Sequence, residues 1–248
     1  MKISLIVILI LLMLALPASA QDSIIEQMIR TRDSIVEVLA ENTDIHQAGK
    51  IKAGIDSRTG RMIVARQAVL QSFQRAGAGV IIHPDGIIVT NAHTANKASM
   101  IKITLGSGES FFAQPVKLAH DLDLLLLKID AGKKLPYVPF ADSDHIQLGQ
   151  DVITIGNSAF LKNTISGGKI IGIGVNRKLK YIGQQRTDLI QTSINLYQGD
   201  SGGPLFDEDG RLIGLMTADE GANDHSSFAI PSNKIRESLV EYLNTNDL

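Results

Sequence analysis

The chain has 248 residues, with 24 Lys and Arg against 26 Asp and Glu, no Cys and an aromatic content of 4%. This length allows one large all-β domain or two small ones, with a sizeable core. Scattered basic residues and few aromatic rings argue against nucleic-acid binding. Without cysteine there is no thiol nucleophile, no disulfide framework and no lipid-attachment cysteine, so the hydrophobic core alone must stabilise the fold.

The first segment, residues 1–20, has the pattern of a secretory signal peptide. Lys2 precedes an uncharged apolar run, and the small residues Ala18, Ser19 and Ala20 close the segment as a cleavage site. The apolar run is shorter than the about 20 residues of a membrane-spanning helix, so we favour cleavage over an uncleaved anchor. We therefore expect an exported protein, periplasmic or secreted, without a stable membrane anchor.

Residues 21–33 are predicted to contain a short amphipathic helix. Apolar residues recur there at helical spacing: Ile24, Ile25, Met28 and Ile29. A first strand is predicted from Ser34. Residues 41–75 are polar and irregular, with several glycines and a basic bias. A segment this long without clear structure is usually functional or mobile, and we interpret it as a loop inserted between the first two strands.

From residue 77 on, short apolar runs alternate with turn residues, which is typical of β-barrels and sandwiches. The predicted strands are AGVII, IIVTN, MIKITL, FFAQPV, DLLLLKI, DVITIG, GGKIIGIGV, TDLIQTS, GPLFD, RLIGLMT and SFAIP. Pro231 and Ser232 then open a final helix with an apolar stripe. A change of pattern near residue 140 divides the chain into a first barrel, residues 34–140, and a second barrel with the helix, residues 141–248.

The stretch QGDSGGP places Ser201 among three glycines. Glycines let the backbone bend sharply and leave N–H groups uncovered, which a tight turn needs and an oxyanion hole also needs. A serine hydroxyl is a poor nucleophile unless a positioned base takes its proton. The stretch by itself therefore leaves both interpretations open.

Among the six histidines, His93 is the best candidate base, because it lies where the predicted strand IIVTN ends. A solvated or hydrogen-bonded histidine is the simpler interpretation of any one of them. Such a base needs a carboxylate that accepts its Nδ1 proton. Asp123, directly before the buried run LLLLKI, is the first candidate and Asp121 the second; a charge at a strand entry is the alternative for both.

His93, Asp123 and Ser201 follow the chain order His, Asp, Ser of the chymotrypsin-like double β-barrel. GDSGG also fits the G-x-S-x-G turn of α/β hydrolases. That fold requires the order Ser, Asp, His and helices around the serine. No helix is predicted there, which makes this alternative weak.

Four runs resemble the trypsin-like proteases, and specifically the HtrA family of exported bacterial proteases: GAGVIIHPDGIIVTNAHTA, HDLDLLLLKIDA, QTSINLYQGDSGGPLFDEDGRLIGLMTA and FAIPSNKI. The resemblance covers residues 34–243 and implies an all-β fold of two six-stranded antiparallel β-barrels with short terminal helices. It implies that His93 is the general base, that Asp123 orients it and that Ser201 is the nucleophile. It also implies polypeptide substrates, with no metal and no cofactor.

The resemblance further implies an oxyanion hole built from Gly199, Asp200 and Ser201, with the N–H groups of Gly199 and Ser201 as the donors. The family usually has Asn-Pro-Gly-Asn before the serine, where this chain has Tyr-Gln-Gly-Asp. We expect Asp200 to find a basic partner in a neighbouring loop. The N-terminal helix is expected either to mediate packing of a homotrimer or to cover one end of a barrel.

The sixth residue before the serine, Asn195, is uncharged, and we expect Leu215, Met216 and Thr217 to line the wall of the substrate pocket. Such a pocket favours small or medium aliphatic side chains at the cleavage point. The family often appends PDZ domains, but only five residues follow Leu243, so we expect a protease domain alone. The competing class is an inactive protease fold that only binds peptides.

Overall fold

The structure is a computed structural model that describes residues 31–55, 57–59, 62–156, 164–178, 185–197, 199–219 and 226–246. The predicted signal peptide and most of the predicted N-terminal helix lie outside these residues. Within the described ranges, no helix is long and apolar enough to cross a membrane.

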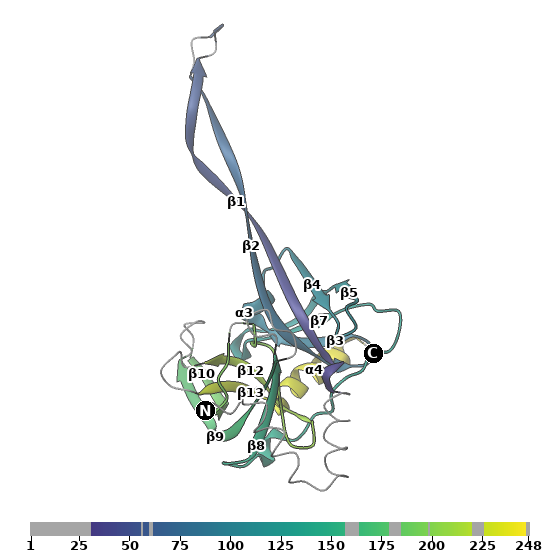
Figure 1. The fold of residues 1–248 in the computed structure, drawn as a ribbon. Helices are drawn as coiled ribbons and strands as arrows, with labels where there is room; N and C mark the ends of the chain where they lie inside the picture. The colour runs from purple at the N-terminus through teal and green to yellow at the C-terminus, as the bar shows by residue number, and fades with distance from the viewer. Residues whose placement is uncertain are drawn as a thin grey trace, which may run out of the picture.

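The first half of the chain forms a seven-stranded antiparallel sheet in the order β5-β4-β1-β2-β3-β7-β6 (Figure 1). Its strands are β1 (Ile35–Ile55), β2 (Met62–His83), β3 (Ile87–Asn91), β4 (Met100–Thr104), β5 (Ser110–Phe112), β6 (Gln114–Ala119) and β7 (Leu124–Lys128). The short helix α3 (Ala92–Ala95) follows β3, and a 3-10 turn, His120–Leu122, precedes β7.

The second half forms a closed barrel in the order β10-β13-β12-β11-β8-β9. Its strands are β8 (Asp151–Gly156), β9 (Thr164–Lys178), β10 (Gln185–Thr192), β11 (Pro204–Phe206), β12 (Leu212–Asp219) and β13 (Ser227–Pro231). Helix α4 (Ser232–Asn246) follows directly, and the segment between the sheets holds a 3-10 turn, Ser143–His145. The predicted all-β fold of two antiparallel units is confirmed.

The first unit has seven strands where we expected six, and the difference lies at one residue. β5 and β6 are separated only by Ala113, whose N–H donates to the carbonyl of Ile101 at 2.9 Å. β5 pairs with β4, and β6 pairs with β7. The two edges of the sheet are therefore joined by a single bent stretch of chain, which is the predicted strand FFAQPV with a break inside it.

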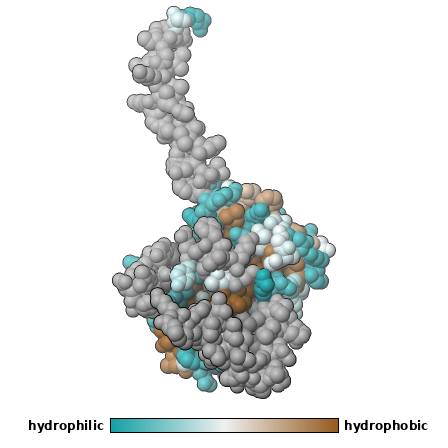
Figure 2. Space-filling model, viewed as in Figure 1, coloured by the Kyte–Doolittle hydropathy of each residue, from teal (hydrophilic) through white to brown (hydrophobic). Residues whose placement is uncertain are grey.

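The interpretation of residues 41–75 as an inserted loop is wrong. This segment forms the outer parts of β1 and β2, which pair with each other as far as Ile55 and Met62. β1 pairs with β4 only up to Glu41, and β2 with β3 only from Val80. The outer hairpin therefore projects from the first sheet, as Figure 1 shows, and Figure 2 shows a hydrophilic tip at residues 57–59.

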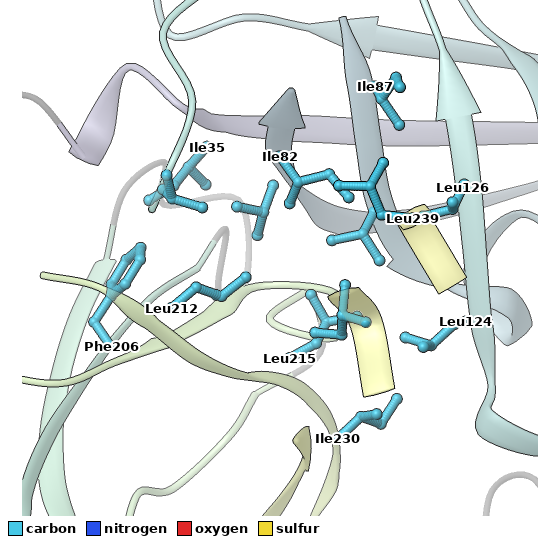
Figure 3. Close-up of a cluster of buried hydrophobic side chains, with 14 of the residues drawn as sticks. Ile35, Ile82, Ile87, Leu124, Leu126, Phe206, Leu212, Leu215, Ile230 and Leu239 are labelled. Atoms are coloured by element: carbon cyan, nitrogen blue, oxygen red, sulfur yellow. The ribbon is translucent and has the colours of Figure 1, made fainter. Parts of the chain in front are cut away.

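The buried run before Lys128 explains how the two units are joined. Leu125 and Leu127 pack in a cluster formed by residues 36–135 of the first half of the chain alone. Leu124 and Leu126 point the other way, into a cluster that also contains residues of the second barrel and α4. Figure 3 shows these residues together with Phe206, Leu212, Leu215 and Ile230 of the second barrel and Leu239 of α4. Each fully buried Leu stabilises the fold by about 1.5–3 kcal/mol.

Candidate active site

His93 and Asp123 are brought together from two neighbouring strands. β3 ends at Asn91, and His93 lies in the short helix α3 that follows. Asp123 ends the 3-10 turn with φ 59° and ψ 33°, a left-handed conformation that Asp tolerates better than most residues. β3 and β7 pair Asn91 with Leu124, so both side chains leave the same end of the sheet. His93 Nδ1 lies 2.7 Å from Asp123 Oδ2.

The carboxylate of Asp123 is almost fully buried and accepts three hydrogen bonds. Besides the ring of His93, its partners are the backbone N–H of His93 on Oδ1 at 2.9 Å and the hydroxyl of Thr217 on Oδ2 at 2.9 Å. A buried carboxylate needs such donors to offset its lost hydration. Because Oδ2 is an acceptor, the ring keeps its proton on Nδ1 and leaves the lone pair of Nε2 free.

Asp121, the second candidate carboxylate, is not the partner of His93. Asp121 is exposed within the 3-10 turn, whereas Asp123 is 2% exposed and bonded to the histidine. The charge at this strand entry is therefore part of a hydrogen-bonded pair.

Ser201 lies in the turn before β11, and β2 holds that turn in place. The N–H of Ala78 donates to the carbonyl of Ser201 at 2.9 Å. A Cβ atom added to Gly77 would lie 2.7 Å from Cγ2 of Thr94 and 2.9 Å from the same Ser201 carbonyl. Thr94 directly follows His93. The helix that holds His93 and the turn that holds Ser201 therefore both pack closely against Gly77 of β2.

The backbone before the serine presents two unused donors. The N–H of Asp200 donates to the carbonyl of Tyr197 at 3.0 Å, and its Oδ2 accepts the N–H of Tyr197 at 2.9 Å. Among the described residues, the N–H groups of Gly199 and Ser201 donate to no acceptor. Two uncovered N–H groups flanking a serine are what an oxyanion hole requires. A basic partner for Asp200 stays a prediction.

The predicted pocket wall needs correction. Leu215 and Met216 have no exposed surface, because β12 is paired on both sides at Leu215 and their side chains pack in hydrophobic clusters. Thr217 is 2% exposed and bonded to Asp123. These three side chains are therefore buried in the interior behind the site and do not line the substrate pocket. Asn195 is exposed, between the buried Ile194 and Leu196.

Thr217 is a residue whose role the sequence analysis missed. The signal available was a hydroxyl within the otherwise apolar run LIGLMT.

We predict that Thr217→Val, which keeps the shape of the side chain but removes the hydroxyl donor, lowers kcat about tenfold, since a hydrogen bond to a charged group contributes about 1.5–3 kcal/mol. Steady-state kinetics on a peptide substrate measures this. Thr192→Val is the matched control, because its buried hydroxyl bonds to Ser227 instead; equal losses in both variants would contradict the role.

Comparison with known proteins agrees with this geometry. A family model described as the trypsin-like peptidase domain matches residues 77–215. Serine protease HTRA4 of Mus musculus is 34% identical over 233 residues, covering 86% of this chain and 47% of its own. Periplasmic serine endoprotease DegP of Escherichia coli (strain K12) is 35% identical over 179 residues, covering 69% of this chain and 37% of its own.

Solved structures of the HtrA-type protease AlgW with a decapeptide also match. One has a TM-score of 0.73 and 25% identity and covers 91% of this chain and 68% of its own. Another has a TM-score of 0.69 and 26% identity, with 89% and 67% covered. The chain belongs to the trypsin-like peptidase domain family. Within that family its relatives are HtrA serine proteases, and it spans less than half the length of HTRA4 or DegP.

Proposed function

We propose that the chain is a serine endopeptidase in which Ser201, His93 and Asp123 act as a triad. The observation that carries this is the 2.7 Å contact between His93 Nδ1 and the buried carboxylate of Asp123. Gly77 of β2 packs against Thr94, the neighbour of His93, and Ala78 of β2 donates to the carbonyl of Ser201, so one strand supports both parts of the triad. A carboxylate in this place orients the imidazole and stabilises the imidazolium that forms during the reaction.

The reaction takes place in two halves. The Oγ of Ser201 attacks the carbonyl carbon of the scissile bond while Nε2 of His93 takes the hydroxyl proton. His93 then gives that proton to the leaving amine, the C–N bond breaks, and an acyl-enzyme ester remains. Water, deprotonated by the same Nε2, attacks the ester; the C–O bond breaks, Nε2 returns the proton to Oγ, and the acid and the free Ser201 are released. The N–H groups of Gly199 and Ser201 stabilise the negative oxygen in both halves.

Polypeptide substrates suit the edge of β12. From Thr217 on, β12 pairs only with β13 within the part of the chain that the structure describes. An extended peptide can add to such an open edge through main-chain hydrogen bonds, largely independent of its sequence. The decapeptide in the AlgW structures belongs to a relative with the same fold and supports this substrate class.

For the cleavage point we propose small or medium aliphatic side chains, now on the basis of Asn195 alone. It is exposed and carries no charge that would select a basic or acidic side chain. A peptide library with a preference for Arg or Lys at this position would contradict the proposal.

We also propose that the protein is exported and acts on exported or misfolded proteins. The signal-peptide pattern of residues 1–20 supports export, and the relative DegP is described as periplasmic. A mature protein that begins at Gln21 would agree, and an intact N-terminus on the exported protein would contradict cleavage. The homotrimer stays a prediction.

The experiment for the proposed function is proteolysis of an unfolded polypeptide such as reduced casein by the whole chain. Ser201→Ala should lower the rate at least about 10⁴-fold, because the nucleophile is lost while the fold is kept. Far-UV circular dichroism checks the fold of the variant. If wild type and variant both bind the polypeptide and neither cleaves it, the competing peptide-binding class is correct.

A further inference from the structure

Arg186, the second residue of β10, is a buried cation that the proposed mechanism does not use. It is 6% exposed, and its Nη2 donates to the carbonyl of His120 at 3.2 Å. Its Nε is buried without a hydrogen-bond partner, and within the described ranges the guanidinium forms no ion pair. A buried arginine without a carboxylate costs stability. Among the residues that the structure describes, the His120 carbonyl is the one hydrogen-bond partner of the Arg186 guanidinium.

A β-bulge turns Arg186 inward. The register of β9 and β10 shifts between Arg186 and Leu189, which pair with Arg177 and Val175. Within the bulge Asp188 has φ 60°, and its N–H donates to the Asn176 side chain at 3.1 Å. Residues three apart on a regular strand face opposite sides, but here both Arg186 and Leu189 are buried. The backbone is thus shaped to direct this arginine at the first sheet.

The carbonyl that Arg186 reaches closes the turn that presents Asp123. The N–H of Asp123 donates to the same His120 oxygen at 3.2 Å, which ends the 3-10 turn and leads into the left-handed Asp123. One carbonyl therefore receives a donor from the first sheet and a donor from the second barrel. The carboxylate at the end of this turn is the one that bonds to His93 at 2.7 Å.

We propose that Arg186 is a positioning residue: it fixes the His120–Leu122 turn and thereby the direction of the Asp123 carboxylate toward His93. The inference rests on the proposed function, and Arg186 itself acts only through the turn. The backbone oxygen of Asp123 already has two donors, the N–H of Ala92 and the side chain of Asn91. These hold the start of β7, whereas Arg186 holds the opposite end of the turn.

The test compares Arg186→Met, which removes the donor and the charge, with Arg186→Lys, which keeps both. We expect Arg186→Met to lower kcat about tenfold to hundredfold with KM within about twofold of wild type, since a small misplacement of a catalytic group has an effect of this size. Arg186→Lys should recover most of the loss. If Arg186→Met does not fold, Arg186→Leu, which also lacks a donor, takes its place, and a wild-type kcat in that variant overturns the proposal.

Arg236→Met is the control. Arg236 is exposed, but it also donates through Nη2 to a backbone carbonyl, that of Ala141 at 3.1 Å, and its hydrogen bonds within the described ranges go to Ala141 and Asn233 rather than to the Asp123 turn. We expect it to lower the unfolding midpoint in urea without changing kcat. An equal fall of kcat in Arg236→Met and Arg186→Met would show a general loss of packing and would overturn the proposal.

A second readout separates this inference from the proposed function. In proton NMR the N–H shared by His93 and Asp123 gives a signal far downfield, because it lies in a short hydrogen bond to a carboxylate. Arg186→Met should shift or broaden that signal, and Arg186→Lys and Arg236→Met should keep it. A wild-type protein without proteolysis would end the proposed function, while an unchanged signal in Arg186→Met would end the role of Arg186.

Discussion

Asp123→Asn lowers kcat by about 10⁴-fold and leaves the fold intact, if His93 and Asp123 work as the structure places them. The reason is that Oδ2 of Asp123 must act as an acceptor. It accepts a hydrogen bond from Nδ1 of His93 and another from the hydroxyl of Thr217. An amide NH₂ in that place offers no acceptor. The imidazole then bonds through an unprotonated Nδ1, its proton moves to Nε2, and Nε2 can no longer take the proton of Ser201.

Asp121→Asn provides the control for this prediction. It makes the same chemical change two residues earlier, on an exposed side chain of the same turn. Its kcat should equal that of wild type. A loss of less than tenfold in Asp123→Asn, or equal losses in the two variants, would contradict the assigned role of Asp123. The kinetics need one peptide substrate at a pH where wild type is fully active.

Gly202→Ala should abolish activity and destabilise the protein. A Cβ atom there would lie 2.1 Å from the carbonyl oxygen of Ala78 and 2.6 Å from Oγ1 of Thr90, and φ is +85°. Neither neighbour can yield easily, because Ala78 is backbone in β2 and the Thr90 hydroxyl is fixed on the same oxygen. The turn must move away from β2 and take Ser201 with it. We expect at least about a hundredfold loss of kcat and about 2–4 kcal/mol less stability.

Gly108→Ala isolates the backbone strain from the steric overlap. Gly108 has φ +90°, but nothing lies within 4 Å of its Cβ position. Strain alone should lower stability by about 1 kcal/mol and leave kcat unchanged. Urea unfolding and steady-state kinetics on both variants make the comparison. If Gly202→Ala behaves like Gly108→Ala, the serine turn does not depend on its close contact with β2.

Most of the fold could be predicted because most strands bury at least one face. The run LLLLK is apolar throughout, since Leu124 and Leu126 face one hydrophobic cluster while Leu125 and Leu127 face another. The outer hairpin could not be predicted in the same way. It has strands beyond Glu41, but no third strand pairs with it in the described chain, so no core imposes an alternating pattern on its sequence.

The histidine and its carboxylate could be predicted because their places at strand ends are local features. The roles of Thr217 and Arg186 could not, because each depends on a contact with a residue more than 60 positions away in the chain. The pocket prediction failed for a related reason. Leu215 and Met216 look like a pocket wall in sequence, but β12 pairs with β11 and β13 on either side of Leu215. Only the pairing shows which residues are enclosed.

The most direct test of the central claim is labelling of the folded whole chain with a fluorophosphonate, followed by mass spectrometry of its peptides. An activated serine attacks the phosphorus atom, the fluoride leaves and a stable phosphonyl ester forms, whereas ordinary serines do not react. The account predicts one modified residue, Ser201, and no labelling of Ser201→Ala or of heat-unfolded wild type. A folded wild-type protein that stays unlabelled, or that is labelled equally in Ser201→Ala, would contradict it.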